Sequence, residues 1–157
     1  MSQPQTAPIT LLQRRRIEAE ILKPVYEVLK ERLGPEEAKT VLGAAIQKVA
    51  REGARKLAQE MGGGTLAKLI DLQPLWRRDE ALKVTVLKED AHNFDYNVTR
   101  CAYAAMYRDL GLGDLGFFLS CLRDGAFIEG FAPDIELTRT QTLMEGASHC
   151  DFRYRVK

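Results

Sequence analysis

A change in hydrophobic period near residue 80 constrains the fold of this chain more than any other feature. Before it, apolar residues recur at helical spacing between Ile17 and Leu33 and again between Ala38 and Met61. After it, they alternate with polar residues from Leu82 to Val86 and from Phe94 to Val98. Helices followed by strands that enclose further helices indicate an α+β fold with an antiparallel sheet, rather than a doubly wound parallel one.

Two long helices are predicted in the N-terminal half. The first is expected to be kinked or split at Pro24 and to end at Gly34, because proline lacks the amide hydrogen of the helical ladder and glycine commonly follows a helix. Pro35 opens the second helix, since proline is favoured in a first turn. Gly62 to Gly64 end it, and a short helix is expected over residues 65–75.

The rest of the chain is predicted to form two hairpins around two helical segments. Strands are expected at 82–87, 94–99, 135–144 and 149–156, with helical segments at 101–110 and 114–131. We therefore predict a flexible tail over residues 1–10 and a single α+β domain over 11–157. In that domain, N-terminal helices (11–75) pack on a small antiparallel sheet within a core over 82–156.

Composition excludes several classes of protein. The 157 residues include 23 Lys and Arg against 22 Asp and Glu, so the basic footprint of a nucleic-acid-binding protein is absent, and Arg14 to Arg16 are interpreted as a solvated helix face. No stretch reaches the roughly 18 apolar residues that a membrane span needs, and no secretory signal is visible. Three cysteines without a C-x-x-C pair are expected to be free thiols of a cytoplasmic protein.

Three segments of the C-terminal half resemble the L-2-amino-thiazoline-4-carboxylic acid hydrolase family. They read T-R-C-A-Y-A-A-M-Y-R-D-L-G (99–111), L-G-F-F-L-S-C (115–121) and E-L-T-R-T-Q-T-L-M-E-G-A-S-H-C-D-F-R-Y (136–154), within a resemblance that spans residues 94–155. The resemblance implies hydrolytic opening of a small cyclic amidine: water adds at the ring carbon between nitrogen and sulfur, and a carbon–nitrogen bond breaks. It also implies a small-molecule substrate that carries a carboxylate.

A second resemblance leaves an alternative function open. The segment G-A-S-H-C-D-F-R-Y (146–154) is similar to the closing pattern of four-vinyl-reductase-type small-molecule-binding domains. This likeness implies a ligand pocket in an α+β fold and no catalysis. The alternative to a hydrolase is therefore a non-catalytic small-molecule-binding or sensor domain.

Cys101 is the candidate nucleophile. It follows a predicted strand and opens a predicted helix, where unpaired amide groups and the helix dipole stabilise an anion and lower the pKa of a thiol. Arg100 adds a nearby positive charge. A thiolate in this position attacks an amidine carbon and forms an adduct that water releases. The alternative is a small buried residue at a strand–helix junction.

Three further residues are candidates for catalytic roles. His149 suits general-base chemistry because imidazole titrates near neutrality, and alternation turns it away from Cys150 towards Cys101 or a water. Asp124 lies beside apolar residues, which raises the pKa of a carboxyl and suits an acid or base. Cys150 is expected to border the same site. The alternatives are a solvated turn residue, a solvated helix charge and a core thiol, respectively.

Arg139 is the candidate anchor for the substrate carboxylate. The predicted strand over 135–144 places it among apolar side chains, and a buried guanidinium requires a negative partner. Its planar fork suits bidentate binding of a carboxylate. The alternative is an internal salt bridge to Asp124, Glu129 or Asp95.

The remaining expectations concern the pocket and its contents. Phe127, Glu129 and Tyr103 are expected to contact the substrate, because small-molecule sites are mostly apolar with few polar groups; the alternatives are core aromatics and a solvated charge. No cofactor is expected. A zinc site would require four donors whose spacing matches no zinc motif: Cys101, Cys121, His149 and Cys150. The long amphipathic N-terminal helices leave homo-oligomerisation open.

Overall fold

The computed structural model describes residues 7–157 and has the expected α+β architecture. In chain order, its main elements are α1 (Leu11–Leu33), α2 (Pro35–Glu60), α3 (Leu66–Arg77), β1 (Leu82–Glu89), β2 (Asn93–Cys101), α4 (Ala102–Asp109), α5 (Leu122–Phe131), β3 (Ile135–Thr138) and β4 (Cys150–Val156). A π-helical turn, η2 (Phe117–Cys121), leads directly into α5. Most of the predicted tail, residues 1–6, lies outside the described residues.

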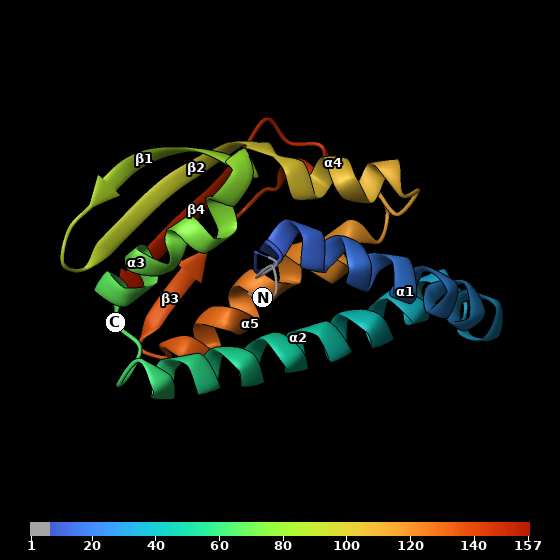
Figure 1. The fold of residues 1–157 in the computed structure, drawn as a ribbon, viewed down its shortest axis with the longest axis horizontal. Helices are drawn as coiled ribbons and strands as arrows, with labels where there is room; N and C mark the ends of the chain where they lie inside the picture. The colour runs from blue at the N-terminus through green and yellow to red at the C-terminus, as the bar shows by residue number, and fades with distance from the viewer. Residues whose placement is uncertain (1–6) are drawn as a thin grey trace, which may run out of the picture.

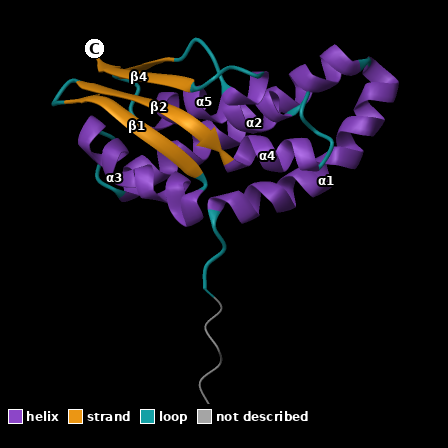
Figure 2. Ribbon diagram, turned by 90° about the horizontal axis from the view of Figure 1, so that it is seen from above, coloured by secondary structure: helices purple, strands orange, loops and turns teal. Residues whose placement is uncertain are grey.

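The four strands form one antiparallel sheet in the order β1-β2-β4-β3. Both predicted hairpins are confirmed, since β1 pairs with β2 and β3 pairs with β4. Between them, β2 pairs with β4, although paired residues such as Val98 and Cys150 lie 52 positions apart in the chain (yellow and red in Figure 1). Figure 2 shows the sheet as a layer with the helices gathered on one side of it. The sheet therefore has an inner face against helices and an outer face without them.

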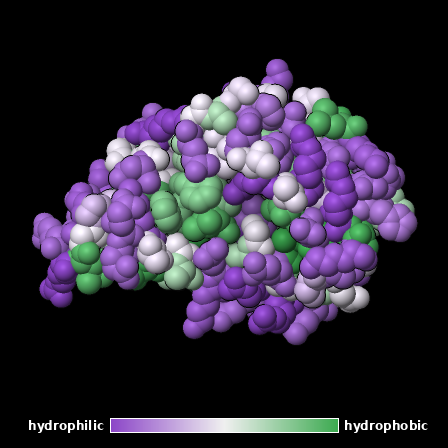
Figure 3. All heavy atoms as spheres, turned by 180° about the vertical axis from the view of Figure 1, so that it is seen from behind, coloured by the Kyte–Doolittle hydropathy of each residue, from purple (hydrophilic) through white to green (hydrophobic). Residues whose placement is uncertain are grey.

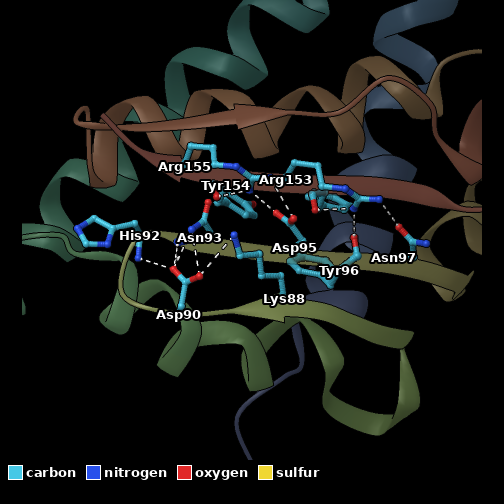
Figure 4. A network of polar contacts seen from close by, with 11 residues as sticks. Lys88, Asp90, His92, Asn93, Asp95, Tyr96, Asn97, Arg153, Tyr154 and Arg155 are labelled. Atoms are coloured by element: carbon cyan, nitrogen blue, oxygen red, sulfur yellow. Dashed lines mark hydrogen bonds and ion pairs between the residues drawn. The ribbon is translucent and has the colours of Figure 1, made fainter.

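Strand alternation separates the two faces as the sequence predicts. On the inner face, Phe94, Tyr96 and Val98 of β2 are paired with Tyr154, Phe152 and Cys150 of β4, and all six are buried. Residues at the intervening positions point to the outer face. There, Asp95 and Asn97 interact with Arg155 and Arg153 (Figure 4). The molecular surface seen from behind is largely hydrophilic, with hydrophobic atoms in separate patches (Figure 3).

The N-terminal helices begin and end as their sequence predicts, with one exception. Thr10 and Gln13 form a reciprocal capping box at the start of α1, and Gly34, at φ 84°, ends it directly before Pro35 of α2. The expected split of the helix at Pro24 is wrong, because α1 continues through this residue as one helix. Pro24 and the residue one turn before it, Glu20, are exposed, so solvent satisfies the carbonyl group that loses its helical partner.

Close packing of α5 on α2 sets the position of α5 beneath the sheet. A Cβ atom on Gly130 would lie 2.2 Å from the carbonyl oxygen of Arg51 in α2, so only glycine allows this approach. The contact fixes the C-terminal end of α5 directly against α2. None of the helices within residues 7–157 is both long enough and apolar enough to cross a bilayer.

The predicted strand over 135–144 is too long. Strand β3 ends at Thr138, and residues 139–142 leave the sheet. The carboxylate of Asp151 explains the change, because it accepts hydrogen bonds from the backbone amides of Thr140 and Gln141 at 2.9 and 3.0 Å. These amides are therefore unavailable for further pairing between strands.

Candidate functional site

A cavity of about 390 Å³ lies between the inner face of the sheet and the surrounding helices. Its walls include residues from α1, α2, α3 and α5, together with inward-facing residues of β2 and β4. The volume lies within the usual range for small-molecule sites, and most of the lining is apolar. The fold thus provides a ligand-sized space where helices and sheet meet.

Aromatic rings form much of the apolar wall. Trp76 of α3 contacts Phe127 of α5 edge to face, with 5.3 Å between ring centroids. Tyr96 and Phe152 stack at 4.8 Å on the floor made by the sheet. Tyr103 also lines the cavity, and its hydroxyl donates to the carbonyl oxygen of Trp76. The expected pocket positions of Phe127 and Tyr103 therefore agree with the structure.

All three cysteines line this cavity and are free thiols. Cys101 is the last residue of β2 and the N-cap of α4, where its sulfur accepts the amide N–H of Ala104 at 3.4 Å. Cys121 ends the π-helical turn that precedes α5. Cys150 begins β4, and its sulfur accepts the amide N–H of Leu143. Residues separated by up to 49 positions in the chain thus line one cavity.

The position predicted for Cys101 is correct, but the predicted direction of its pKa shift is wrong. Burial raises the pKa of the Cys101 thiol, and this effect exceeds the opposing effect of the amide groups of Ala104 and Tyr103. Burial also raises the pKa of Cys150, to about 11, and that of Cys121 more strongly. The cavity thiols are therefore protonated at neutral pH.

Asp124 of α5 lines the cavity and forms an ion pair with Arg139. The guanidinium donates to Oδ2 of Asp124 at 2.5 Å and to the carbonyl oxygen of Cys121 at 3.0 Å, and it lies over the Phe152 ring. Burial raises the pKa of Asp124, although the positive charge of Arg139 opposes this shift. Asp124 is therefore a more basic carboxylate than one in water.

The predicted role of Arg139 as a carboxylate anchor is not supported by its position. Arg139 is not among the cavity-lining residues, and its guanidinium is already bound to Asp124. This arrangement is the internal salt bridge that the sequence left as the alternative. Burying a guanidinium without a negative partner is costly, and the nearest carboxylate of the protein meets that requirement before a ligand arrives.

His149 and Glu129 also lie away from the cavity lining. His149 lies in the bend directly before β4, where its ring contacts the hydroxyl of Ser148 and the side-chain amide of Gln141. Glu129 pairs with Arg51 of α2 at 2.6 Å, and its side chain is 59% exposed. The site roles predicted for His149 and Glu129 are therefore corrected to polar contacts outside the cavity.

A charged group at the cavity was missed in the sequence. Arg14, Arg15 and Glu18 of α1 line the cavity together with Arg123 of α5. Arg15 is only 17% exposed in its side chain and pairs with Glu18, so the interpretation of this arginine run as a solvated face is wrong for Arg15. The spacing of Arg15 and Glu18, three residues apart on a helix, was the available signal for the first ion pair. The ion pair between Glu18 and Arg123 joins residues far apart in the chain, so their spacing in the sequence does not predict it.

No metal centre is formed by the residues that the structure describes. Across residues 7–157, no three histidine, cysteine, aspartate or glutamate side chains are grouped so that they could hold an ion. The zinc arrangement of Cys101, Cys121, Cys150 and His149 is therefore not assembled among these residues, and His149 does not line the cavity with the three thiols.

Comparison with solved structures identifies related folds. The phenol-responsive sensory domain of the transcription activator PoxR, in complex with phenol, is similar with a TM-score of 0.56 and 15% identity, over 88% of this chain and 74% of that one. A trafficking protein particle complex subunit 3 from Naegleria fowleri, covalently bound to palmitic acid, is similar with a TM-score of 0.50 and 12% identity, over 90% of this chain and 96% of that one. At these identities, the likeness concerns the fold.

Comparison of the sequence with curated proteins gives no match. The model of the L-2-amino-thiazoline-4-carboxylic acid hydrolase family matches residues 14–154. This range includes the helical half of the chain as well as the three segments that first indicated the resemblance. The match covers most of the chain, so this protein belongs to the L-2-amino-thiazoline-4-carboxylic acid hydrolase family.

Proposed function

We propose that this protein binds a small planar molecule in the cavity and hydrolyses a non-peptide carbon–nitrogen bond in it, as in the opening of a cyclic amidine. The observation that carries the proposal is the set of reactive side chains that line the cavity. Three thiols and an arginine-paired carboxylate lie there, facing a space of about 390 Å³ with aromatic sides. The name of the family supports the hydrolytic step.

In this proposal, Cys101 is the nucleophile and Asp124 is the general base. The Cys101 thiol adds to the amidine carbon, forming a sulfur–carbon bond, while the Asp124 carboxylate takes the thiol proton. The C=N double bond opens as sulfur adds, and its nitrogen takes that proton. When the carbon–nitrogen single bond breaks, this nitrogen leaves as an amine by taking a second proton from the amino group that remains on the carbon. Water then adds to the carbon and the sulfur–carbon bond breaks, so that the two protons of the water go to the remaining nitrogen and to the thiol. A raised pKa at Asp124 favours its acceptance of a proton from a thiol that is neutral at rest.

Binding without turnover is the second candidate, and the thiol pKa values favour it. Burial raises the pKa of each of the three cavity thiols, whereas a cysteine nucleophile is usually activated by a lowered one. The fold is also similar to a phenol-responsive sensory domain whose structure contains phenol. A sensor needs only the shaped apolar cavity.

One assay separates the two candidates. L-2-amino-thiazoline-4-carboxylate is incubated with the native protein and with Cys101→Ser and Cys150→Ser variants, and its consumption and binding are measured separately. Turnover that is lost in Cys101→Ser but retained in Cys150→Ser supports the hydrolase with Cys101 as nucleophile. Full turnover in Cys101→Ser rejects this nucleophile in favour of direct attack by water. Binding without any consumption by the native protein supports the second candidate.

A further inference from the structure

The cavity opens to solvent between α1, α2 and α3. Four of its lining residues are exposed at this opening: Arg14 on α1, Val49 and Gly53 on α2, and Leu75 on α3. Val49 and Leu75 are 61% and 51% exposed, respectively. A ligand that enters between these helices therefore passes the guanidinium of Arg14.

Behind Arg14, two arginines share a single carboxylate. Nη1 of Arg15 lies 3.0 Å from both carboxylate oxygens of Glu18, and Nη2 of Arg123 lies 2.9 Å from one of them. Arg14 itself makes no ion pair or side-chain hydrogen bond with residues 7–157. Three guanidinium groups at this end of the cavity therefore face one carboxylate, which leaves a surplus of positive charge.

This surplus lies in a partly dehydrated environment. The side chains of Arg15 and Arg123 are only 17% and 12% exposed. Burial lowers the pKa of Arg123, and the neighbouring charge of Arg15 lowers it further. The nearby Asp124 carboxylate is engaged by Arg139, so that pair adds no net negative charge to the corner. Charges held away from water interact more strongly with a counter-charge than charges on an open surface.

We infer that this arginine corner (Arg14, Arg15 and Arg123) binds the anionic group of the ligand, and that the unpaired Arg14 contacts it directly. The inference rests on the proposed binding function and specifies its ligand class: a small aromatic or heteroaromatic carboxylate. The planar body occupies the aromatic part of the cavity, while the carboxylate lies towards the opening. Arginine suits this role because its planar fork binds a carboxylate through two parallel hydrogen bonds.

The test compares two probes of nearly equal shape, benzoate and benzamide, by calorimetric titration of the full chain. Benzoate is expected to bind about tenfold more tightly, the difference expected for one charge-assisted hydrogen-bonded pair. Arg14→Gln is expected to reduce this preference about threefold, because Arg14 is exposed and its ion pairs are partly screened. Arg16→Gln is the matched control, since Arg16 lies on the same helix and pairs with Glu20 on the open surface.

For a second variant, the inference predicts tighter binding of benzoate instead of weaker binding. Glu18→Gln removes the carboxylate that competes for Arg15 and Arg123, so it should strengthen the binding of benzoate and leave that of benzamide unchanged. Damage to the fold would weaken both probes, so a selective gain cannot arise from instability.

The outcomes distinguish this inference from the proposed function. Equal affinities for benzoate and benzamide, or a preference that Arg14→Gln and Glu18→Gln leave unchanged, would overturn the arginine corner while leaving cavity binding intact. Failure of both probes and of L-2-amino-thiazoline-4-carboxylate to bind would reject the proposed binding function, and the inference with it.

Discussion

An aspartate–arginine ion pair lies on each side of the sheet, and the two pairs differ in their surroundings. On the outer face, Arg155 donates to both carboxylate oxygens of Asp95, and the Arg155 side chain is 44% exposed (Figure 4). On the inner side, Arg139 is 11% exposed and pairs with Asp124. The two pairs therefore differ in which partner water reaches: the arginine of the outer pair, whose Asp95 is 12% exposed, and the aspartate of the inner pair, which is 31% exposed. The outer pair joins two strands that backbone hydrogen bonds already hold together. The inner pair connects α5 to the segment after β3.

The difference shows that the same chemical pair has different consequences in different environments. Water competes for the outer pair, so its contribution to stability is small. At the cavity, an aspartate without its arginine would be a partly buried, unpaired charge beside three thiols whose pKa values it raises. The inner pair therefore affects both the stability and the chemistry of the site.

The largest expected effect is on stability. Arg139→Met leaves the partly buried Asp124 carboxylate, which is 31% exposed, without its partner and should lower the free energy of unfolding by about 3 kcal/mol, the lower end of the range for a buried pair. Arg155→Met removes the exposed partner and should cost less than about 1 kcal/mol. Urea denaturation of the two variants measures both values. Similar losses would show that burial does not distinguish the two pairs.

Turnover should distinguish the two aspartates. If Asp124 accepts the thiol proton, Asp124→Asn should lower kcat by about 100-fold, which is typical of the loss of a positioned general base. The matched change Asp95→Asn should leave kcat unchanged, because Asp95 lies on the outer face. The rates are compared on folded protein, verified by circular dichroism. An unimpaired Asp124→Asn variant would remove this residue from the mechanism.

A smaller effect is expected on the reactivity of Cys101. Its alkylation by iodoacetamide should be slow at pH 7 and rise about tenfold per pH unit towards its raised pKa, because only the thiolate reacts. The charge of Asp124 contributes to that raised pKa, so Asp124→Asn should modestly increase the rate at a fixed pH. Asp95→Asn should have no effect. The rate is measured with Cys121 and Cys150 replaced by serine.

The smallest expected effect is a difference in carboxyl titration between the turn and the cavity. Asp90 accepts the amide hydrogens of His92 and Asn93, which lowers its pKa to about 2 (Figure 4). Since the unfolded value is 3.8, ionised Asp90 stabilises the fold above that pH, and the contribution is lost as the pH falls towards 2. The pKa of Asp124 shifts in the opposite direction, because burial raises it. Ionisation of Asp124 therefore opposes folding. Carbon-13 NMR titration of the carboxyl groups measures both, and shifts in the same direction would contradict this contrast.

The elements of the fold follow closely from local patterns. Alternation in β2 and β4 correctly predicts which residues face inward, and Gly34–Pro35 correctly marks the junction of α1 and α2. The end of β3 could not be predicted in this way. It depends on Asp151, a residue ten or more positions further along the chain, whose carboxylate binds the amides that the strand would have used.

At the candidate site, too, local sequence predicts some features and not others. The sequence correctly predicts Cys101 at a strand–helix junction and Asp124 beside apolar residues in a helix. It does not reveal that Arg139 is already paired, that His149 does not line the cavity, or that Arg15 does. These features depend on which side chains from distant segments meet.

The sequence by itself determined the helices, the two hairpins and the inward-facing residues, because these depend on side-chain period and on residues a few positions apart. Only the tertiary structure decided which charges are paired and how the thiols titrate. Burial and the distance to a counter-charge control both properties, and both arise from packing between segments that lie far apart in the chain.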